Sequence, residues 1–148
     1  MKRIPFYIIL LILTFLAPVR RVDIEHLEPV EAVFAVRKGN QITLATDTGA
    51  SGTGDDVAQA LIDLEETTPG IVFLDTAHYL LLSTDAQEDV NQLRQHLKGS
   101  VQLCMFEGEQ DPEKAIEHLK VYGKLPQIKD WNPAEPLPVL TEEKIIEK

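Results

Sequence analysis

Between residues 29 and 46, apolar and polar positions follow the two-residue period that is typical of β-strands. Residues 29–37 (PVEAVFAVR) are rich in β-branched and aromatic side chains, and residues 41–46 (QITLAT) alternate Ile and Leu with polar partners. The residues between the two segments, Lys38-Gly39-Asn40, are typical of a turn. The pattern therefore predicts a β-hairpin.

Three later segments have the spacing of a helix with one buried face. They begin near Asp55, near Thr84 and at Asp111. The third has the strongest start signal, because Asp111 suits an N-cap and Pro112 suits the first helical position. Thr84 and Gln87 have the spacing of a capping box. The three apolar stripes consist of Val57, Leu61 and Leu64, of Val90, Leu93 and Leu97, and of Ile116, Leu119 and Tyr122.

Apolar runs between these helices predict further strands at residues 71–74 (IVFL), 78–83 (HYLLLS) and 100–106 (SVQLCMF). The run at 78–83 is apolar on both faces, which predicts a central strand covered on each side. Residues 75–77 either separate the first two strands or form a bulge in one longer strand. The order of elements predicts a single α/β (α+β) domain, with a mixed β-sheet of about four to five strands flanked by three helices.

The C-terminal part of the chain differs in composition. Residues 126–148 contain four of the nine prolines, which disfavour regular elements, so we predict a Pro-rich, flexible tail. Leu125 and Trp131 are the side chains expected to attach the start of this tail to the domain. Residues 141–147 predict a short exposed helix or disorder. The folded domain is thus predicted to comprise residues 22–125.

The first 21 residues have the layout of a signal peptide or signal anchor. A basic start, Met1-Lys2-Arg3, precedes an uncharged apolar run at residues 4–19 (IPFYIILLILTFLAPV), and Arg20-Arg21 follow it. The residues around Ala17 do not suit signal peptidase, so an uncleaved anchor is favoured over a cleaved signal peptide. We therefore predict a domain held outside the cytoplasm at the cell membrane by residues 4–19, or secreted if the segment is cleaved.

Charge narrows the possible partners. The formal net charge is −10, and the chain after Val19 has 12 Lys/Arg against 24 Asp/Glu, a net charge of −12. This balance repels phosphate groups, so we predict no binding to nucleic acid and no polybasic docking on lipid. The single cysteine, Cys104, cannot form an internal disulfide and is expected in the core.

One motif is suggestive of catalysis. Residues 44–49 (LATDTG), continuing as DTGAS at 47–51, resemble the active-site loop of retroviral-type aspartic proteases. In those enzymes two such carboxylates, one from each copy, share a proton. The three predicted helices oppose this interpretation, because those proteases are nearly all β. We therefore predict a loop of turn-forming residues from Asp47 to Gly54. A dimeric aspartic protease that uses Asp47 is the alternative.

Other chemistry-bearing residues show no recognisable arrangement. Gly49, Gly52 and Gly54 precede a helix as in a phosphate-binding loop, but no lysine follows and Asp55-Asp56 would repel a phosphate. The histidines lack metal-ligand spacing and are predicted to be solvated or structural; they are His26, His78, His96 and His118. We therefore predict no catalytic residue, no cofactor site and no metal site, and hence not an enzyme.

The order of features over residues 20–125 is similar to that of a known family. After the apolar segment the chain shows an Arg-Arg/Glu start, a strand, an Ala-Leu helix, and apolar strands with a nearby His before a second helix. These features are RRVDIE at 20–25, the strand at 29–37, VAQAL at 57–61, IVFL at 71–74 and HYLLL at 78–82. In this order the chain resembles the N-terminal domain of the spore germination GerAC, or Ger(x)C, family.

The resemblance implies a non-enzymatic subunit of a germinant-receptor complex that works beside integral-membrane proteins. Family members typically carry a lipobox cysteine and continue into further domains. No cysteine directly follows the apolar run here, and the sequence stops after the Pro-rich tail. With these departures, the resemblance implies a truncated or repurposed relative whose first domain acts as a scaffold. The expected partner is an integral-membrane or envelope protein.

Overall fold

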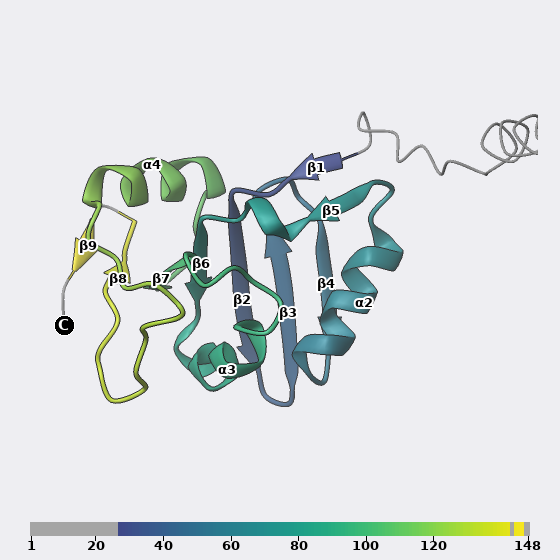
Figure 1. Ribbon diagram of the computed structural model, residues 1–148, viewed down its shortest axis with the longest axis horizontal. Coiled ribbons are helices and arrows are strands. Elements are labelled where there is room, and N and C mark those ends of the chain that lie inside the picture. The colour runs from purple at the N-terminus through teal and green to yellow at the C-terminus, as the bar shows by residue number, and fades with distance from the viewer. Residues whose placement is uncertain (1–26, 143, 147–148) are drawn as a thin grey trace, which may run out of the picture.

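The computed structural model describes residues 27–142 and 144–146 (Figure 1). The predicted membrane segment at residues 4–19 lies outside the described residues. Most of the described chain forms one mixed sheet with the strand order β4-β3-β2-β6-β7-β8-β9. Its strands are β2 (Ala32–Lys38), β3 (Gln41–Thr46), β4 (Ser51–Gly54), β6 (Tyr79–Leu82), β7 (Gln102–Phe106), β8 (Val139–Leu140) and β9 (Ile145–Ile146).

Strands β2, β6, β7 and β8 are parallel neighbours, whereas β3, β4 and β9 pair antiparallel with theirs. The predicted α/β (α+β) class with a mixed sheet is confirmed, and the predicted number of strands is too low. The helical segments are α2 (Val57–Thr67), η2 (Leu74–Thr76), η3 (Thr84–Asp89), α3 (Val90–Leu93) and α4 (Pro112–Tyr122).

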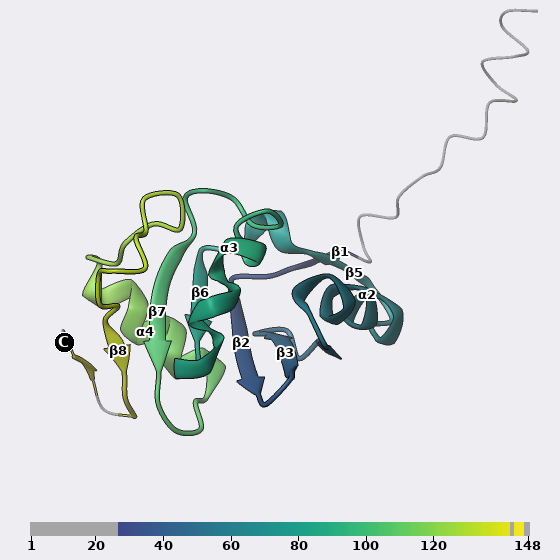
Figure 2. The ribbon, with the colours of Figure 1, turned by 90° about the horizontal axis from the view of Figure 1, so that it is seen from below.

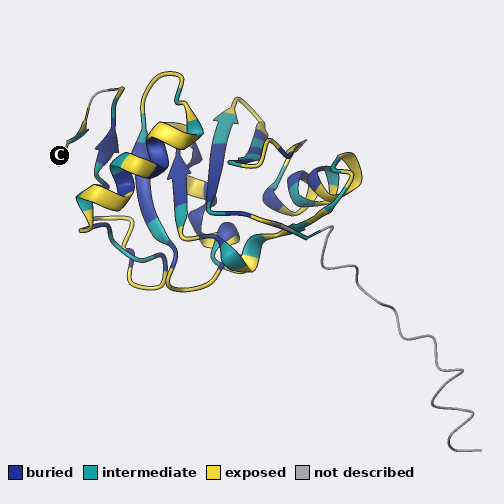
Figure 3. Ribbon diagram, turned by 90° about the horizontal axis from the view of Figure 1, so that it is seen from above, coloured by how far each residue is buried: buried dark blue, intermediate teal, exposed yellow. Residues whose placement is uncertain are grey.

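Helices cover both faces of the sheet. Helix α4 lies in front of the sheet in Figure 3 and behind it in Figure 2, where the sheet is seen from the opposite side. Its residues share one apolar cluster with one face of the sheet, and residues of α2, η3 and α3 share a larger cluster with the other face. Strand β6 contributes Leu80 and Leu82 to the larger cluster and Leu81 to the smaller one, so the predicted central strand is confirmed.

The predicted hairpin is also confirmed, with Gly39 at a positive φ of 59° in the turn between β2 and β3. The prediction of a loop up to Gly54 is wrong, because Ser51–Gly54 form the edge strand β4. Glycine is a poor strand former, but here it permits close packing. A Cβ on Gly52 would lie 2.2 Å from the backbone nitrogen of Leu64 in α2, so the helix rests directly on this strand.

The third predicted helix forms as expected, with Asp111 as N-cap and Gly123 as the left-handed C-cap. The second does not. The chain begins a 3-10 helix at Thr84, its N-cap is Ser83, and no capping-box hydrogen bond forms. Only Val90–Leu93 are α-helical, and the helix ends at Arg94 rather than at Gly99, whose place in the sequence predicts the C-terminal cap.

A second, two-stranded parallel sheet lies apart from the main one. The low hydrophobic periodicity of residues 20–29 predicts a polar connector, which is wrong for residues 27–29, because strand β1 (Leu27–Pro29) pairs with β5 (Ile71–Phe73). The 3-10 helix η2 separates β5 from β6, which confirms the first of the two alternatives for residues 75–77. The predicted strand at 71–74 exists, but it lies outside the main sheet.

The predicted tail is part of the domain. Strand β8 lies beside β7, and the carbonyl oxygens of Pro126 and Pro138 accept hydrogen bonds of 2.8 Å from Leu103 N and Met105 N. Proline lacks an N–H but keeps its carbonyl, so a proline-rich segment can flank a strand through its acceptors. Among the described residues beyond 125, five apolar side chains are buried: Ile128, Trp131, Leu137, Val139 and Leu140. Leu125 and Trp131 are buried as predicted, and residues 145–146 are a strand rather than a helix.

Candidate functional site

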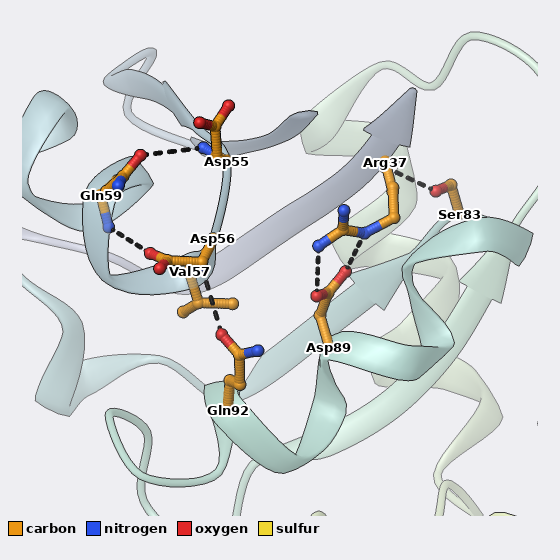
Figure 4. A network of polar contacts seen from close by, with 8 residues as sticks. All are labelled: Arg37, Asp55, Asp56, Val57, Gln59, Ser83, Asp89 and Gln92. Carbon is orange, nitrogen blue, oxygen red and sulfur yellow. Dashed lines mark hydrogen bonds and ion pairs between the residues drawn. The ribbon is translucent and has the colours of Figure 1, made fainter. Parts of the chain in front are cut away.

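The carboxyl ends of parallel strands are where open α/β sheets usually bind ligands. In this chain the ends of β2 and β6 meet around Arg37 (Figure 4). Arg37 Nε and Nη2 donate to the two carboxylate oxygens of Asp89 at 2.7 and 2.5 Å, and Arg37 N donates to Ser83 Oγ at 3.1 Å. The side chains of the ion pair are only 19% and 4% exposed. The hydrogen bond to Asp89 raises the pKa of Arg37 above its ordinary value, against the opposing effect of burial.

Helix α2 begins at the same end of the strands. Backbone N–H groups at its N-terminus donate hydrogen bonds to side chains. Asp56 accepts from Gln59 N at 2.8 Å, and Gln92 Oε1 accepts from Val57 N at 3.4 Å (Figure 4). Gln59 Oε1 in turn accepts from Asp55 N at 3.2 Å. Three of the backbone donors at this helix start, those of Asp55, Val57 and Gln59, are thus used within the protein.

Removal of Asp89 tests how much the ion pair contributes to the stability of the domain. We expect Asp89→Ala to lower the free energy of unfolding by about 3 kcal/mol, because it leaves a largely buried guanidinium without its partner. The double substitution Arg37→Met/Asp89→Leu removes both charges and is expected to recover most of that loss. Urea unfolding curves measure both effects. Asp85→Ala, at an exposed position of the same 3-10 helix, is the control, and an equal loss there would refute this role of the pair.

Asp47, the candidate catalytic residue, lies at the opposite ends of the strands from Arg37, where β3 ends and β2 begins. Its Oδ1 accepts from Glu31 N at 3.1 Å and from Ala32 N at 3.2 Å, and its own N–H donates to Ala32 O at 3.1 Å. The carboxylate therefore fastens the end of β3 to the start of β2. Gly49, at a φ of 92°, makes the turn that follows, in the hairpin between β3 and β4.

A polar hollow of about 470 Å³ lies beside this turn, between β4 and the C-terminal half of α2. It is lined by Thr48, Gly49, Ala50, Ser51, Thr53, Asp63, Thr67, Thr68 and Pro69. Several of its polar groups already bond within the protein: Asp63 Oδ2 accepts from Thr53 N at 2.8 Å, and Thr67 Oγ1 donates to Ser51 O at 3.0 Å. Side chains of α2 thereby reach backbone groups of the edge strand, which protects the edge from pairing with another chain.

A second hollow, of about 400 Å³, lies in the proline-rich segment. Its walls are mostly apolar, with Lys124 and Glu135 as the charged residues: Lys124, Leu125, Pro126, Trp131, Glu135, Pro136, Leu137 and Pro138. The buried Nε1 of Trp131 has no hydrogen-bond partner among the described residues. Arg94 Nη2 donates to Trp131 O at 3.0 Å, which ties the segment to the end of α3.

The remaining candidates lie apart from one another. His78 and His96 are exposed and His118 is partly exposed, while His26 lies outside the described residues. Within the described part of the chain, no group of three or more His, Cys, Asp or Glu is placed to hold a metal ion. Cys104 is buried, and its burial raises the pKa of the thiol to about 12, so almost none of it is the reactive thiolate at neutral pH.

Sequence reasoning missed the contact of Arg37 with Asp89. The only signals were an arginine at the end of an apolar strand and an aspartate directly before the apolar Val90.

Comparison with known proteins adds no assignment: no protein-family model, curated protein or solved structure matches this chain. Among residues 27–142 and 144–146, no helix has the length and apolar character needed to cross a bilayer.

Proposed function

We propose that this chain is a non-enzymatic, membrane-tethered binding or scaffold domain on the outer side of the cell membrane, like the first domain of a germinant-receptor C subunit of the Ger(x)C family. The observation that carries the proposal is the use of Asp47: one of its carboxylate oxygens is committed to the backbone N–H groups of Glu31 and Ala32. At the other end of the strands, the side chain of Arg37 is paired with Asp89, which also supports a non-enzymatic role.

The tether and the partner follow from the sequence. Residues 4–19 are apolar and uncharged, and we assign them as the anchor in the membrane. The acidic domain disfavours nucleic acid and anionic lipid headgroups as partners. We therefore propose an integral-membrane or envelope protein as the partner, with no cofactor.

The first experiment is a pull-down from detergent-solubilised membranes with the full-length chain and with Asp47→Asn. The asparagine retains Oδ1 as the acceptor for Glu31 N and Ala32 N, so the fold is expected to survive, whereas an aspartic protease would lose its carboxylate. Recovery of the same integral-membrane protein by both versions, with equal yield, is the expected result.

The opposite result would favour the alternative. If the wild-type chain retains no membrane protein and shows a proteolytic activity that disappears in Asp47→Asn, the chain is a dimeric aspartic protease. A protease-accessibility assay on intact cells tests the location of the domain. If added protease does not cleave the domain, the domain is not on the outer side of the membrane, and the proposal is refuted.

A further inference from the structure

The small parallel sheet has an apolar outer face. The register pairs Leu27 with Ile71 and Pro29 with Phe73, and partners in register point to the same side of a parallel sheet. Val72 points the other way and packs against the main core. Ile71 is 50% and Phe73 40% exposed, Pro29 is exposed, and Leu27 is partly so. We call these four residues the ribbon face.

This exposure differs from that of other apolar residues on the surface. Single exposed apolar side chains are normal, whereas large contiguous exposed apolar patches mark interaction sites. Ile62 and Val121 are exposed singly on α2 and α4, but the ribbon face is continuous across two paired strands. The ribbon is also held firmly, because Thr76 Oγ1 accepts from Val30 N and donates to Val30 O, both at 2.9 Å.

The ribbon lies at the start of the domain. Only residues 20–26 separate the apolar segment from β1, and a chain can extend over at most about 29 Å across those eight Cα–Cα steps. If residues 4–19 lie in the membrane, as proposed above, the ribbon face is confined to the zone next to the bilayer. Its occupant must therefore be present at the membrane surface.

The charges around the ribbon favour a protein over lipid as that occupant. Residues 22–36 and 39–93 contain no lysine or arginine, although they supply both strands of the ribbon and the whole of α2. Carboxylates flank β5 in the sequence at Glu65, Glu66 and Asp75, and Lys120 of α4 pairs with Glu31, just after β1, at 2.6 Å. Anionic lipid headgroups would be repelled, whereas an apolar surface rimmed by Lys or Arg would be complementary.

We propose that the ribbon face is the docking surface for the integral-membrane partner, and that it binds an apolar, basic-rimmed patch on the outer surface of that protein. The inference rests on the proposed function, since it names the surface through which the tethered domain acts. A patch of four side chains is small, but tethering in the same membrane raises the effective concentration, so a weak contact suffices.

Photo-crosslinking in intact membranes tests the contact. A benzophenone amino acid replaces Phe73 in the full-length chain, and Val121 in the control. We expect a discrete adduct with an integral-membrane protein from position 73 and none from position 121, and we expect Ile71→Ser to reduce the adduct at least tenfold. Adducts with phospholipid only, no adduct, or the same adduct from both positions would overturn the proposal.

A paired pull-down separates this inference from the proposed function. Ile71→Ser/Phe73→Ser is compared with the matched surface variant Ile62→Ser/Val121→Ser, and thermal unfolding confirms that each is folded. A tenfold loss of the partner in the ribbon variant alone is the expected outcome. If both variants retain the partner at wild-type yield, the function stands and the ribbon proposal fails. If the wild-type chain retains no partner, the proposed function itself fails.

Discussion

A chain that ends at Leu125 is expected not to fold. The deletion removes the five buried side chains of the C-terminal segment, and burial of each contributes about 1.5–3 kcal/mol. Their sum, on the order of 7–15 kcal/mol, equals the whole stability of a typical domain. The deletion also leaves the N–H groups of Leu103 and Met105 without the carbonyls of Pro126 and Pro138.

Near-ultraviolet circular dichroism and urea unfolding of residues 20–125 and 20–148 measure this effect. The shorter chain is expected to lack the near-ultraviolet signal and a cooperative transition. A third chain that ends at Thr141 removes β9 alone and is expected to unfold cooperatively at a slightly lower midpoint. Equal midpoints for residues 20–125 and 20–148 would mean that the C-terminal segment is an accessory tail after all.

The parts of the fold that the sequence predicts well are those in which local signals and tertiary packing agree. The hairpin at 32–46 has alternating apolar and polar residues and a glycine in its turn. Helix α4 has a capping residue at each end, Asp111 and Gly123. Strand β6 is apolar at every position because both faces of the sheet are covered there, so its central place was also predictable.

The elements that could not be predicted depend on contacts between distant residues. Strand β4 has the composition of a loop, and it is a strand because α2 packs on its glycines. The proline-rich segment has few signals for regular structure, and β8 forms because β7 offers an open edge. Strand β1 has three residues and exists only through its pairing with β5.

The same reasoning applies to the candidate sites. Arg37 and Asp89 are 52 positions apart, and no local pattern links them. They meet because β2 and β6 are parallel neighbours, and the chain turns into η3 directly after β6. The role of Asp47 was equally hidden, because the motif around it is similar to a catalytic loop while its partners are backbone groups.

Gly52→Ala is expected to destabilise the domain by about 4 kcal/mol or more, which is extreme for one added methyl group. The new Cβ would lie 2.2 Å from Leu64 N and 2.3 Å from Ala60 O, and these backbone atoms cannot move aside without shifting α2. Overpacking that side chains can absorb usually costs about 1–3 kcal/mol. Separation of α2 from β4 would also break the bond from Thr53 N to Asp63.

Urea unfolding of the chain from Arg20 onward measures this loss, with Gly99→Ala as the matched control. At Gly99 the nearest atom to a new Cβ is the Cβ of Lys129, 3.2 Å away, and a shift of a few tenths of an ångström relieves this mild contact, so we expect a change of less than about 1 kcal/mol. Amide exchange adds a local readout, because in Gly52→Ala the amides of α2 should exchange faster than those of α4. If Gly52→Ala unfolds within about 1 kcal/mol of the wild type, α2 does not rest on β4, and the glycines at 52 and 54 need another explanation.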